Sequence, residues 1–440
     1  WRAHLVGVAH QPSLRLLAGA AFVLTLFVGT EWALDGAFFG ISGTITAGEL
    51  VPFMYYTQNL VLPVRFAAWV TGLYKSATSS AKRVLGVQRM EPPRDEGTTD
   101  LERFPPVTKP TLMANFDDVV TDTALTKERI DAFLADESAI GRRFLDRYPV
   151  WTTSGTTGEP GVFVQDDRTL LLVDVLPDRW LLPGLLDAHS LRRLVGNGLR
   201  GAEIAVTGGH FAGASGVALL RRESRFLRNR IRLFSPTGPL DDLIAGLNRY
   251  RPAFVVGYST VLVELARAQR EGRLHVDPAL VVPTAEPVSD AQKAEMRRAF
   301  DCTVREVYGA TECFPIAVEC GHGNLHANTD WFVVEPVDEA YRPVDPGESS
   351  DTVLVTNLSN RVQPLVRYDL GDSVTVYEEP CPCGSAFPVV DVEGRQGDVL
   401  RFETDQGERL VFPLAVSSVV EEVPGVRRAQ IVRTAPSTLR

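Results

Sequence analysis

The sequence predicts an α-helical transmembrane hairpin followed by an α/β domain with mixed sheets and a shortened C-terminal subdomain. Two observations lead to this prediction. The first 90 residues contain two long apolar stretches, whereas short apolar runs alternate with amphipathic segments from about residue 101 onward. The sign of the net charge changes at the same place. The first 90 residues hold seven Lys or Arg and three Asp or Glu, whereas the 440-residue chain as a whole has a net charge of −10. The acidic balance excludes a general nucleic-acid-binding protein.

The hairpin is predicted from two stretches of helix length. Leu16–Leu34 is apolar apart from two threonines and one glutamate, and its 19 residues approach the number that spans a bilayer. Leu50–Tyr74 is amphipathic, and the loop Asp35–Glu49 joins the two stretches. Basic residues flank the pair on both sides, so the positive-inside rule places both ends in the cytoplasm. We therefore expect a membrane protein that inserts through residues 16–74 and has residues 91–440 in the cytoplasm; two buried helices of a soluble protein are the alternative.

The segment Ile41–Val84 resembles the last two membrane helices of ABC exporters. The resemblance rests on its Gly-Thr-Ile-Thr-Ala-Gly-Glu-Leu turn, its aromatic helix with a central proline and its Ala/Ser-rich end. The chain contains no G-x-x-x-x-G-K-[ST] loop and no LSGGQ-like signature, so it has no motif to power transport. Two alternatives follow for the whole chain: a membrane transport component with a nucleotide-binding appendage, or an artificial joining of two neighbouring reading frames.

An α/β domain is predicted over residues 102–393, after a Pro- and acid-rich linker at 91–101. Strand-like runs alternate with helical patterns such as the apolar series from Leu240 to Leu247, which favours a parallel sheet covered on both faces. Shorter β-type runs follow with little helix between them, and residues 394–440 are predicted to form a hinge and a partial C-terminal subdomain. The predicted strands are Glu203–Thr207, Ala253–Gly257, Ala279–Val282, Val304–Val307, Trp331–Glu335, Thr352–Thr356 and Ser373–Tyr377.

A dense block of hydroxyl and glycine residues, Thr152–Gly161, follows a strand-like segment. Glycines let a backbone approach an anion closely, and hydroxyls with free N–H groups can surround phosphate oxygens. A solvated Ser/Thr/Gly loop is the alternative. Four further motifs follow in order along the chain: Thr284–Pro287 (TAEP), Tyr308–Glu312 (YGATE), Arg367–Asp372 (RYDLGD) and Gly394–Asp398 (GRQGD).

Together with the hydroxyl loop, these motifs resemble those of adenylate-forming enzymes, specifically the phenylacetate–CoA ligase family and its capsule-biosynthesis-like relatives. The resemblance covers roughly residues 102–440. It implies ATP-dependent activation of a small carboxylic acid, with ATP or AMP, Mg²⁺ and CoA as cofactors, and it leaves a homo-oligomer open. It implies Thr311, Glu312 and Arg395 as catalytic residues, with Glu312 also holding Mg²⁺. The implied nucleotide-binding residues are Thr153, Ser154, Gly155, Thr156, Thr157, Gly158, Glu286, Pro287, Tyr308, Gly309 and Asp372.

The sequence also departs from the family's pattern. Only 42 residues follow Asp398, about half of what the family's mobile domain needs, and the catalytic lysine of that domain has no counterpart because Lys293 is the last lysine. We therefore expect a truncated subdomain, weakened adenylation and still weaker thioester formation. His210 follows a predicted strand and is a weak candidate for the wall of the acyl pocket.

A second constellation comprises Cys320, His326, Cys381 and Cys383, in the segments ECGHGNLH and CPCGS. Three thiolates and an imidazole suit a tetrahedral structural Zn²⁺. His322 competes with His326 as the fourth ligand, and the resemblance favours His326. Buried free cysteines are the alternative.

Overall fold

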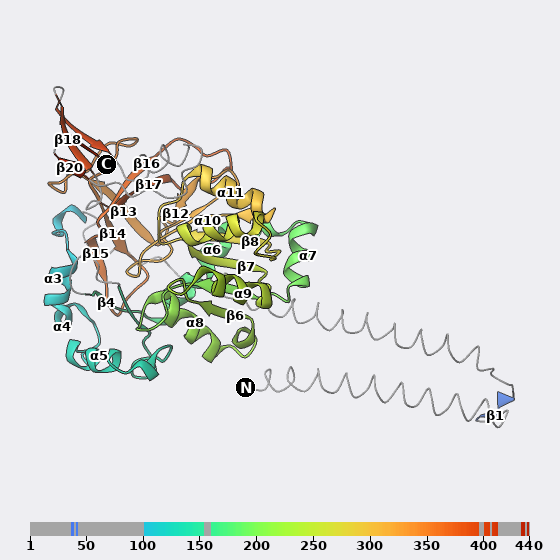
Figure 1. Cartoon of the computed structure of the whole chain (residues 1–440). Coiled ribbons are helices and arrows are strands. Elements are labelled where there is room, and N and C mark those ends of the chain that lie inside the picture. Colours follow the sequence, from blue (N-terminus) through green and yellow to red (C-terminus); the bar gives the residue numbers. More distant parts are fainter. Residues whose placement is uncertain are drawn as a thin grey trace. The chain divides into compact units, whose positions relative to one another are not determined.

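The chain is represented by a computed structural model, which describes residues 101–153, 160–395 and 400–404 together with the short segments 37–38, 41–42, 407–411, 433–435 and 438–439. The chain divides into two compact units, Trp1–Pro93 and Arg94–Arg440 (Figure 1). The division falls inside the predicted linker, and the finer domain boundaries remain predictions.

In the first unit the structure describes one short antiparallel pair, β1 (Ala37–Phe38) and β2 (Ile41–Ser42). Both strands lie in the predicted loop. The two apolar stretches on either side, Leu16–Leu34 and Leu50–Tyr74, lie outside the described residues.

The expected membrane location is corrected by the structure. None of the described helices is long and apolar enough to cross a membrane. The longest of them, α6 (Asp167–Leu181), has 15 residues, whereas a bilayer span needs about 20 predominantly apolar ones. It also carries charged side chains and buries one face on the protein, so it belongs to a folded body. The transmembrane part of the predicted fold class therefore has no support among the described residues, and neither has the assignment of 91–440 to the cytoplasmic side of a membrane.

Short helices open the second unit and hold a small hairpin. The hairpin pairs β3 (Val150–Thr152) with β4 (Val162–Val164) in antiparallel register. Thr108 and Thr126 cap two of the helices, each accepting a backbone N–H with its hydroxyl. Apolar side chains of these helices pack with those of both strands in one cluster, which fixes the hairpin. The elements are η1 (Leu101–Arg103), α3 (Lys109–Ala114), α4 (Phe116–Val119), α5 (Lys127–Leu134) and η2 (Glu137–Ala139).

A ten-stranded mixed sheet forms the centre of the second unit, in the order β16-β17-β12-β11-β10-β8-β7-β5-β6, with β9 beside β8. Strands β5 to β10 pair in parallel, and β11, β12, β16 and β17 continue the sheet in antiparallel fashion from β10. Their bounds are β5 Gly201–Ile204, β6 Ile231–Phe234, β7 Phe254–Tyr258, β8 Leu280–Thr284, β9 Thr303–Val304, β10 Val307–Tyr308, β11 Ala317–Glu319, β12 Leu325–Ala327, β16 Asp372–Tyr377 and β17 Val389–Arg395.

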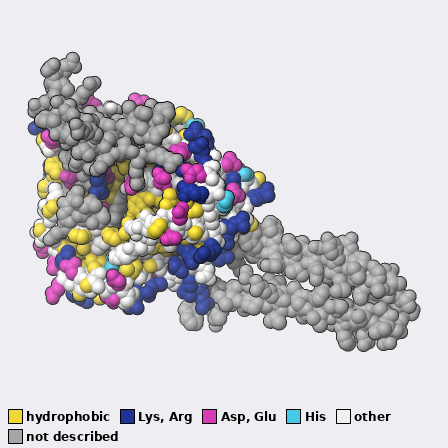
Figure 2. Space-filling model, in the orientation of Figure 1, with side chains coloured by type: hydrophobic (Ala, Val, Ile, Leu, Met, Phe, Trp, Pro, Cys, Tyr) yellow, Lys and Arg dark blue, Asp and Glu magenta, His cyan; other side chains and the backbone are white. Residues whose placement is uncertain are grey.

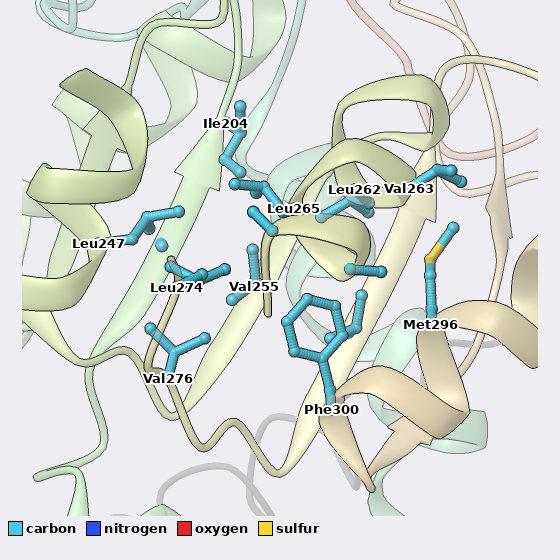
Figure 3. Close-up of a cluster of buried hydrophobic side chains, with 14 of the residues drawn as sticks. Ile204, Leu247, Val255, Leu262, Val263, Leu265, Leu274, Val276, Met296 and Phe300 are labelled. Atoms are coloured by element: carbon cyan, nitrogen blue, oxygen red, sulfur yellow. The ribbon is translucent and has the colours of Figure 1, made fainter. Parts of the chain in front are cut away.

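Helices cover both faces of the parallel part, as predicted. On β8, Val281 faces a core made with α9, α10 and α11, and Leu280 and Val282 face a second core made with α6 and η3 (Figures 1 and 3). This alternation is that of a strand buried on both sides. The helices are η3 (Leu182–Leu185), α7 (Ala188–Gly196), α8 (Ala212–Glu223), η4 (Leu227–Asn229), α9 (Leu240–Tyr250), α10 (Ser259–Arg270) and α11 (Asp290–Phe300).

A separate antiparallel sheet joins β13 (Phe332–Val337), β14 (Thr352–Asn357) and β15 (Leu365–Asp369). Two further strand pairs follow, β18 (Leu400–Thr404) with β19 (Gly407–Val411) and β20 (Arg433–Ala435) with β21 (Thr438–Leu439). The mixed sheets of the prediction are therefore confirmed.

Every predicted strand overlaps an observed one, but the run Val304–Val307 divides into two. Its first half, β9, pairs with the beginning of β8, and its second half, β10, pairs with Thr284 at the end of β8. Between them Glu306 does not pair with β8, and its main-chain N–H donates to the Glu319 carboxylate.

Candidate active site and metal centre

Three of the predicted site residues, on β10, β16 and β17, meet through their side chains. Tyr308 ends β10, and its hydroxyl donates to Asp372 Oδ2 over 2.9 Å. Asp372 begins β16 and lies opposite Arg395, the last residue of β17, whose Nε is 3.7 Å from Asp372 Oδ1. The β16–β17 register therefore places the carboxylate opposite the guanidinium, and the Tyr308 side chain adds a phenol to this pair.

The carboxyl of Asp372 is buried, and this burial raises its pKa from 3.8 to about 6, although the Tyr308 hydrogen bond and Arg395 act in the opposite direction. The group is therefore ionised at neutral pH and can accept hydroxyl donors. Burial also raises the pKa of Tyr308 well above its usual value of 10, so the phenol stays protonated and donates.

Glu312 is buried beside this group. The hydroxyl of Tyr368 donates to Glu312 Oε1 over 3.1 Å, and burial raises the pKa of Tyr368, which keeps it a donor. Thr311 is half-buried, and its carbonyl accepts from Gln165 Nε2 at 3.4 Å. Gly309 allows the backbone to pass close to a ring, since a Cβ there would lie 2.7 Å from Phe314.

Glu286 lies after β8, next to the N-terminus of α10. Its Oε2 accepts from the N–H of Thr260 at 2.9 Å and from the Thr260 hydroxyl at 2.8 Å. A carboxylate at this position satisfies free N–H groups and the positive end of the helix dipole. Pro287, which follows it, is exposed. The described contacts of Glu286 are therefore those of a helix cap.

Most of the predicted phosphate loop lies outside the described residues: Ser154, Gly155, Thr156, Thr157 and Gly158. The structure describes its base. Thr153 N–H donates to the carbonyl of Gly161 over 3.0 Å, and Gly161 N–H donates to the Thr153 hydroxyl over 2.8 Å. Thr153 therefore closes the loop between β3 and β4, and its hydroxyl takes part in that closure.

Amide side chains that the sequence reasoning did not identify hold this hairpin in place. Gln363 accepts from the N–H of Val164 at 2.7 Å, and Asn360 donates to the carbonyl of Val164 at 2.8 Å. Asn360 also donates to Gln165, the residue that contacts Thr311. The only sequence feature that could have indicated these side chains is the Asn/Gln-rich stretch after a predicted strand. Tyr368 was missed as well, although it lies inside a recognised motif.

The four predicted metal ligands come together from two segments of the chain. Their ligand atoms all lie within 4.8 Å of one another, with the Cys320 and Cys381 sulfurs 3.9 Å apart and Cys383 Sγ 3.3 Å from His326 Nε2. His322 is exposed and falls outside this group; only its main-chain N–H approaches, donating to Cys320 Sγ.

The surroundings of the four residues fit a thiolate-bound metal. His326 Nδ1 lies 2.8 Å from the carbonyl of Phe387, which orients Nε2 toward the sulfurs. Donors also point at sulfur: Asn324 Nδ2 at 3.2 Å from Cys381 and Ser385 N–H at 3.4 Å from Cys383. The indole of Trp180 in α6 stacks on the His326 ring, with centroids 4.7 Å apart and planes 4° apart. Three sulfurs and one nitrogen are the ligand set that Zn²⁺ prefers.

His210 and Lys293, the two other residues named in the sequence analysis, are both buried. His210 is buried against Phe133, at 5.3 Å between ring centroids, and burial lowers its pKa. Lys293 lies in a buried ion-pair network, 3.3 Å from Glu306 and 3.4 Å from Glu319. It therefore cannot supply the mobile lysine of the resembled family.

Comparison with known proteins gives the fold. No protein-family model matches the chain. A 138-residue stretch, 31% of this chain and 29% of the relative, is 29% identical to Protein CapK of Staphylococcus aureus. Over 287 residues the chain is 24% identical to a phenylacetate-coenzyme A ligase of Thermus thermophilus, covering 63% of this chain and 60% of that protein. It therefore spans less than two thirds of either curated relative.

Among solved structures, 2-hydroxyisobutyryl-CoA ligase in the postadenylation state matches with a TM-score of 0.52 and 19% identity, over 75% of this chain and 65% of that one. Its complex with 2-HIB-AMP matches with the same TM-score, at 18% identity. The chain has the adenylate-forming acyl-CoA ligase fold. The sequence resemblance to this class is confirmed for the ligase part, whereas neither the comparisons nor the described residues support an ABC-exporter segment or the transport alternative.

Proposed function

We propose that the chain is an ATP-dependent acid–CoA ligase, similar to phenylacetate–CoA ligase, which activates a small carboxylic acid as its acyl adenylate. The observation that carries the proposal is the buried Asp372, held between Tyr308 and Arg395 beside Glu312, on the ligase fold. A buried carboxylate with a free acceptor edge suits the paired hydroxyls of a ribose, and the Tyr308 ring suits an adenine face.

In the proposed reaction a carboxylate oxygen of the acid attacks the α-phosphorus of ATP. A new P–O bond forms, the bond to the bridging oxygen breaks, and pyrophosphate leaves. The protein's part is to position anions and neutralise their charge. Arg395 would balance negative charge at the α-phosphate, Thr311 would contact that phosphate, and the hydroxyl loop that begins at Thr153 would hold the β- and γ-phosphates. In a second step the sulfur of CoA attacks the acyl carbon and AMP leaves.

Two metals fit the described side chains. The buried Glu312 carboxylate suits Mg²⁺, a hard cation that neutralises phosphate charge when bound. Cys320, His326, Cys381 and Cys383 suit a structural Zn²⁺, which would tie the β11–β12 turn to the loop before β17.

Calorimetry on the full chain tests the nucleotide site. AMP should bind once per chain, and ATP with Mg²⁺ should compete with AMP for that site. Asp372→Ala should weaken AMP binding by about tenfold to a hundredfold, since hydrogen bonds to a charged group contribute about 1.5–3 kcal/mol. Asp330→Ala is the control, because that exposed carboxylate pairs with Arg179 of α6 instead. Absence of nucleotide binding by folded protein would remove the basis of the proposal.

A further inference from the structure

Six arginines gather at one edge of the ligase-fold body, and we call them the basic edge. They come from the residue before β5, the end of α8, η4, and the beginning of β6, the edge strand of the large sheet. Figure 2 shows Lys and Arg side chains gathered over the part of the surface that carries α8, β6 and α9. The six are Arg200, Arg221, Arg222, Arg228, Arg230 and Arg232.

Carboxylates do not neutralise this edge. Among the residues that the structure describes, no ion pair involves any of the six; the nearby Glu223 pairs with Arg143 at 2.6 Å instead. The guanidinium groups bond main-chain carbonyls: Arg221 and Arg228 each donate to the other's carbonyl, at 3.0 and 3.2 Å. Such bonds orient the cations and leave their charge uncompensated, although the whole chain is acidic.

Tyr250 lies at the centre of the basic edge. The guanidinium groups of Arg232 and Arg200 lie over its ring, 5.5 and 5.8 Å from the centroid. Burial raises the pKa of Tyr250, and the charges of Arg200, Arg232, Arg221 and Arg230 all act against this rise. Its hydroxyl is buried and has no hydrogen-bond partner among the described residues. A buried donor without a partner costs stability in the folded state.

The basic edge lies at the end of the sheet where the parallel strands begin, and the candidate active site lies where a parallel strand ends. Arg200 and Arg230 precede the parallel strands β5 and β6, and their carbonyls accept from Ala253 and Gly201 where β7 and β5 begin. Tyr308, in contrast, is the last residue of the parallel strand β10. A neighbouring cavity of about 350 Å³ has Arg251 in its lining, and the Arg251 carbonyl accepts from Arg200. A ligand at this edge would therefore be distinct from the nucleotide of the proposed reaction.

We propose that the basic edge binds a compact polyphosphate anion, whether free or as the phosphate chain of a nucleotide. Guanidinium groups match phosphate oxygens in bidentate geometry and remain charged at every physiological pH. Their gathering around a single phenol suits a short, multiply charged anion better than an extended polymer. The proposal does not rest on the proposed ligase function.

Titration calorimetry with inorganic tripolyphosphate on the full chain tests the site. One saturable site is expected, and Arg230→Gln with Arg232→Gln should weaken it at least about tenfold. Tyr250→Phe should weaken it by a smaller factor while the protein stays folded. The matched control is Arg298→Gln with Arg342→Gln, two exposed arginines from elsewhere on the body, which should bind like wild type.

Asp372→Ala separates this site from the catalytic one, because it should leave tripolyphosphate binding unchanged even if no acyl adenylate is ever made. In that background, tighter binding of ATP than of tripolyphosphate identifies a nucleotide as the source of the phosphate chain, and equal binding identifies the free anion. The proposal is overturned if the two double variants bind equally. It is also overturned if a single-stranded oligonucleotide displaces tripolyphosphate and the logarithm of its binding constant falls with the logarithm of salt concentration with a slope of about −4. That slope corresponds to about six phosphate contacts, and the surface would then bind an extended nucleic acid.

Discussion

Replacement of Cys381 by serine tests the metal centre most sharply. The change removes one sulfur from a group of four ligand atoms that lie within 4.8 Å of one another, and it leaves the fold's apolar cores untouched. A bound structural metal stabilises the folded state by mass action, so losing it lowers the melting temperature.

The size of the effect follows from the size of the unit. A metal present at about a thousand times its dissociation constant contributes about 4 kcal/mol. A unit of about 350 residues unfolds with an entropy of about 0.7 kcal/mol per degree. Cys381→Ser should therefore lower the melting temperature by about 6 °C and abolish about one equivalent of bound zinc.

The assay combines metal analysis with thermal unfolding, and Trp180 adds a local probe because it stacks on His326. A chelator should shift wild type toward the variant and change the Trp180 emission. Cys302→Ser is the matched control: this half-buried thiol lies outside the group, and burial raises its pKa to about 12, so it stays a thiol. Wild-type protein purified without chelators that carries no zinc, or whose melting temperature a chelator leaves unchanged, would refute the reasoning.

Three further predictions concern charged side chains, two of them buried and one exposed. Because burial raises the pKa of Asp372 from 3.8 to about 6, ionisation destabilises the folded state as pH rises through that window. Asp372→Asn should therefore gain about 3 kcal/mol of stability relative to wild type between about pH 3 and 7 in urea unfolding. Lys293→Met should cost about 3–5 kcal/mol, since it leaves Glu306 and Glu319 buried without that cation. Lys127→Met breaks an exposed ion pair in which Lys127 Nζ lies 2.6 Å from Asp131, and it should cost no more than about 0.5 kcal/mol of stability. Equal costs for the two lysine substitutions would contradict the argument from burial.

Local sequence patterns predicted the parallel part of the fold well. The run Ala253–Gly257 and the helical series from Leu240 to Leu247 appear nearly where expected, because a strand buried on both faces must be apolar and an amphipathic helix buries one apolar face. The division of Val304–Val307 could not be predicted, because it depends on which part of β8 each half pairs with.

The candidate site was predictable where a motif carries its own chemistry. The Cys and His segments predicted four candidate metal ligands, and the structure groups these four side chains, with His326 rather than His322 among them. The amide network of Asn360 and Gln363 could not, because it joins segments about 200 residues apart, which only the folded chain brings together. The cap formed by Glu286 was missed for the same reason: its partner Thr260 belongs to another strand–helix connection.

The most direct test of the central claim is a single-turnover adenylation measurement. The full chain, in excess over ATP, is incubated with Mg²⁺ and each of a panel of small carboxylic acids, and the nucleotide products are separated. The proposed ligase function predicts acid-dependent conversion of ATP to acyl-AMP and pyrophosphate, lost in Asp372→Ala and reduced in Glu312→Gln. Formation of ADP and phosphate, or ATP left unchanged by a chain that binds it, would contradict the proposed chemistry.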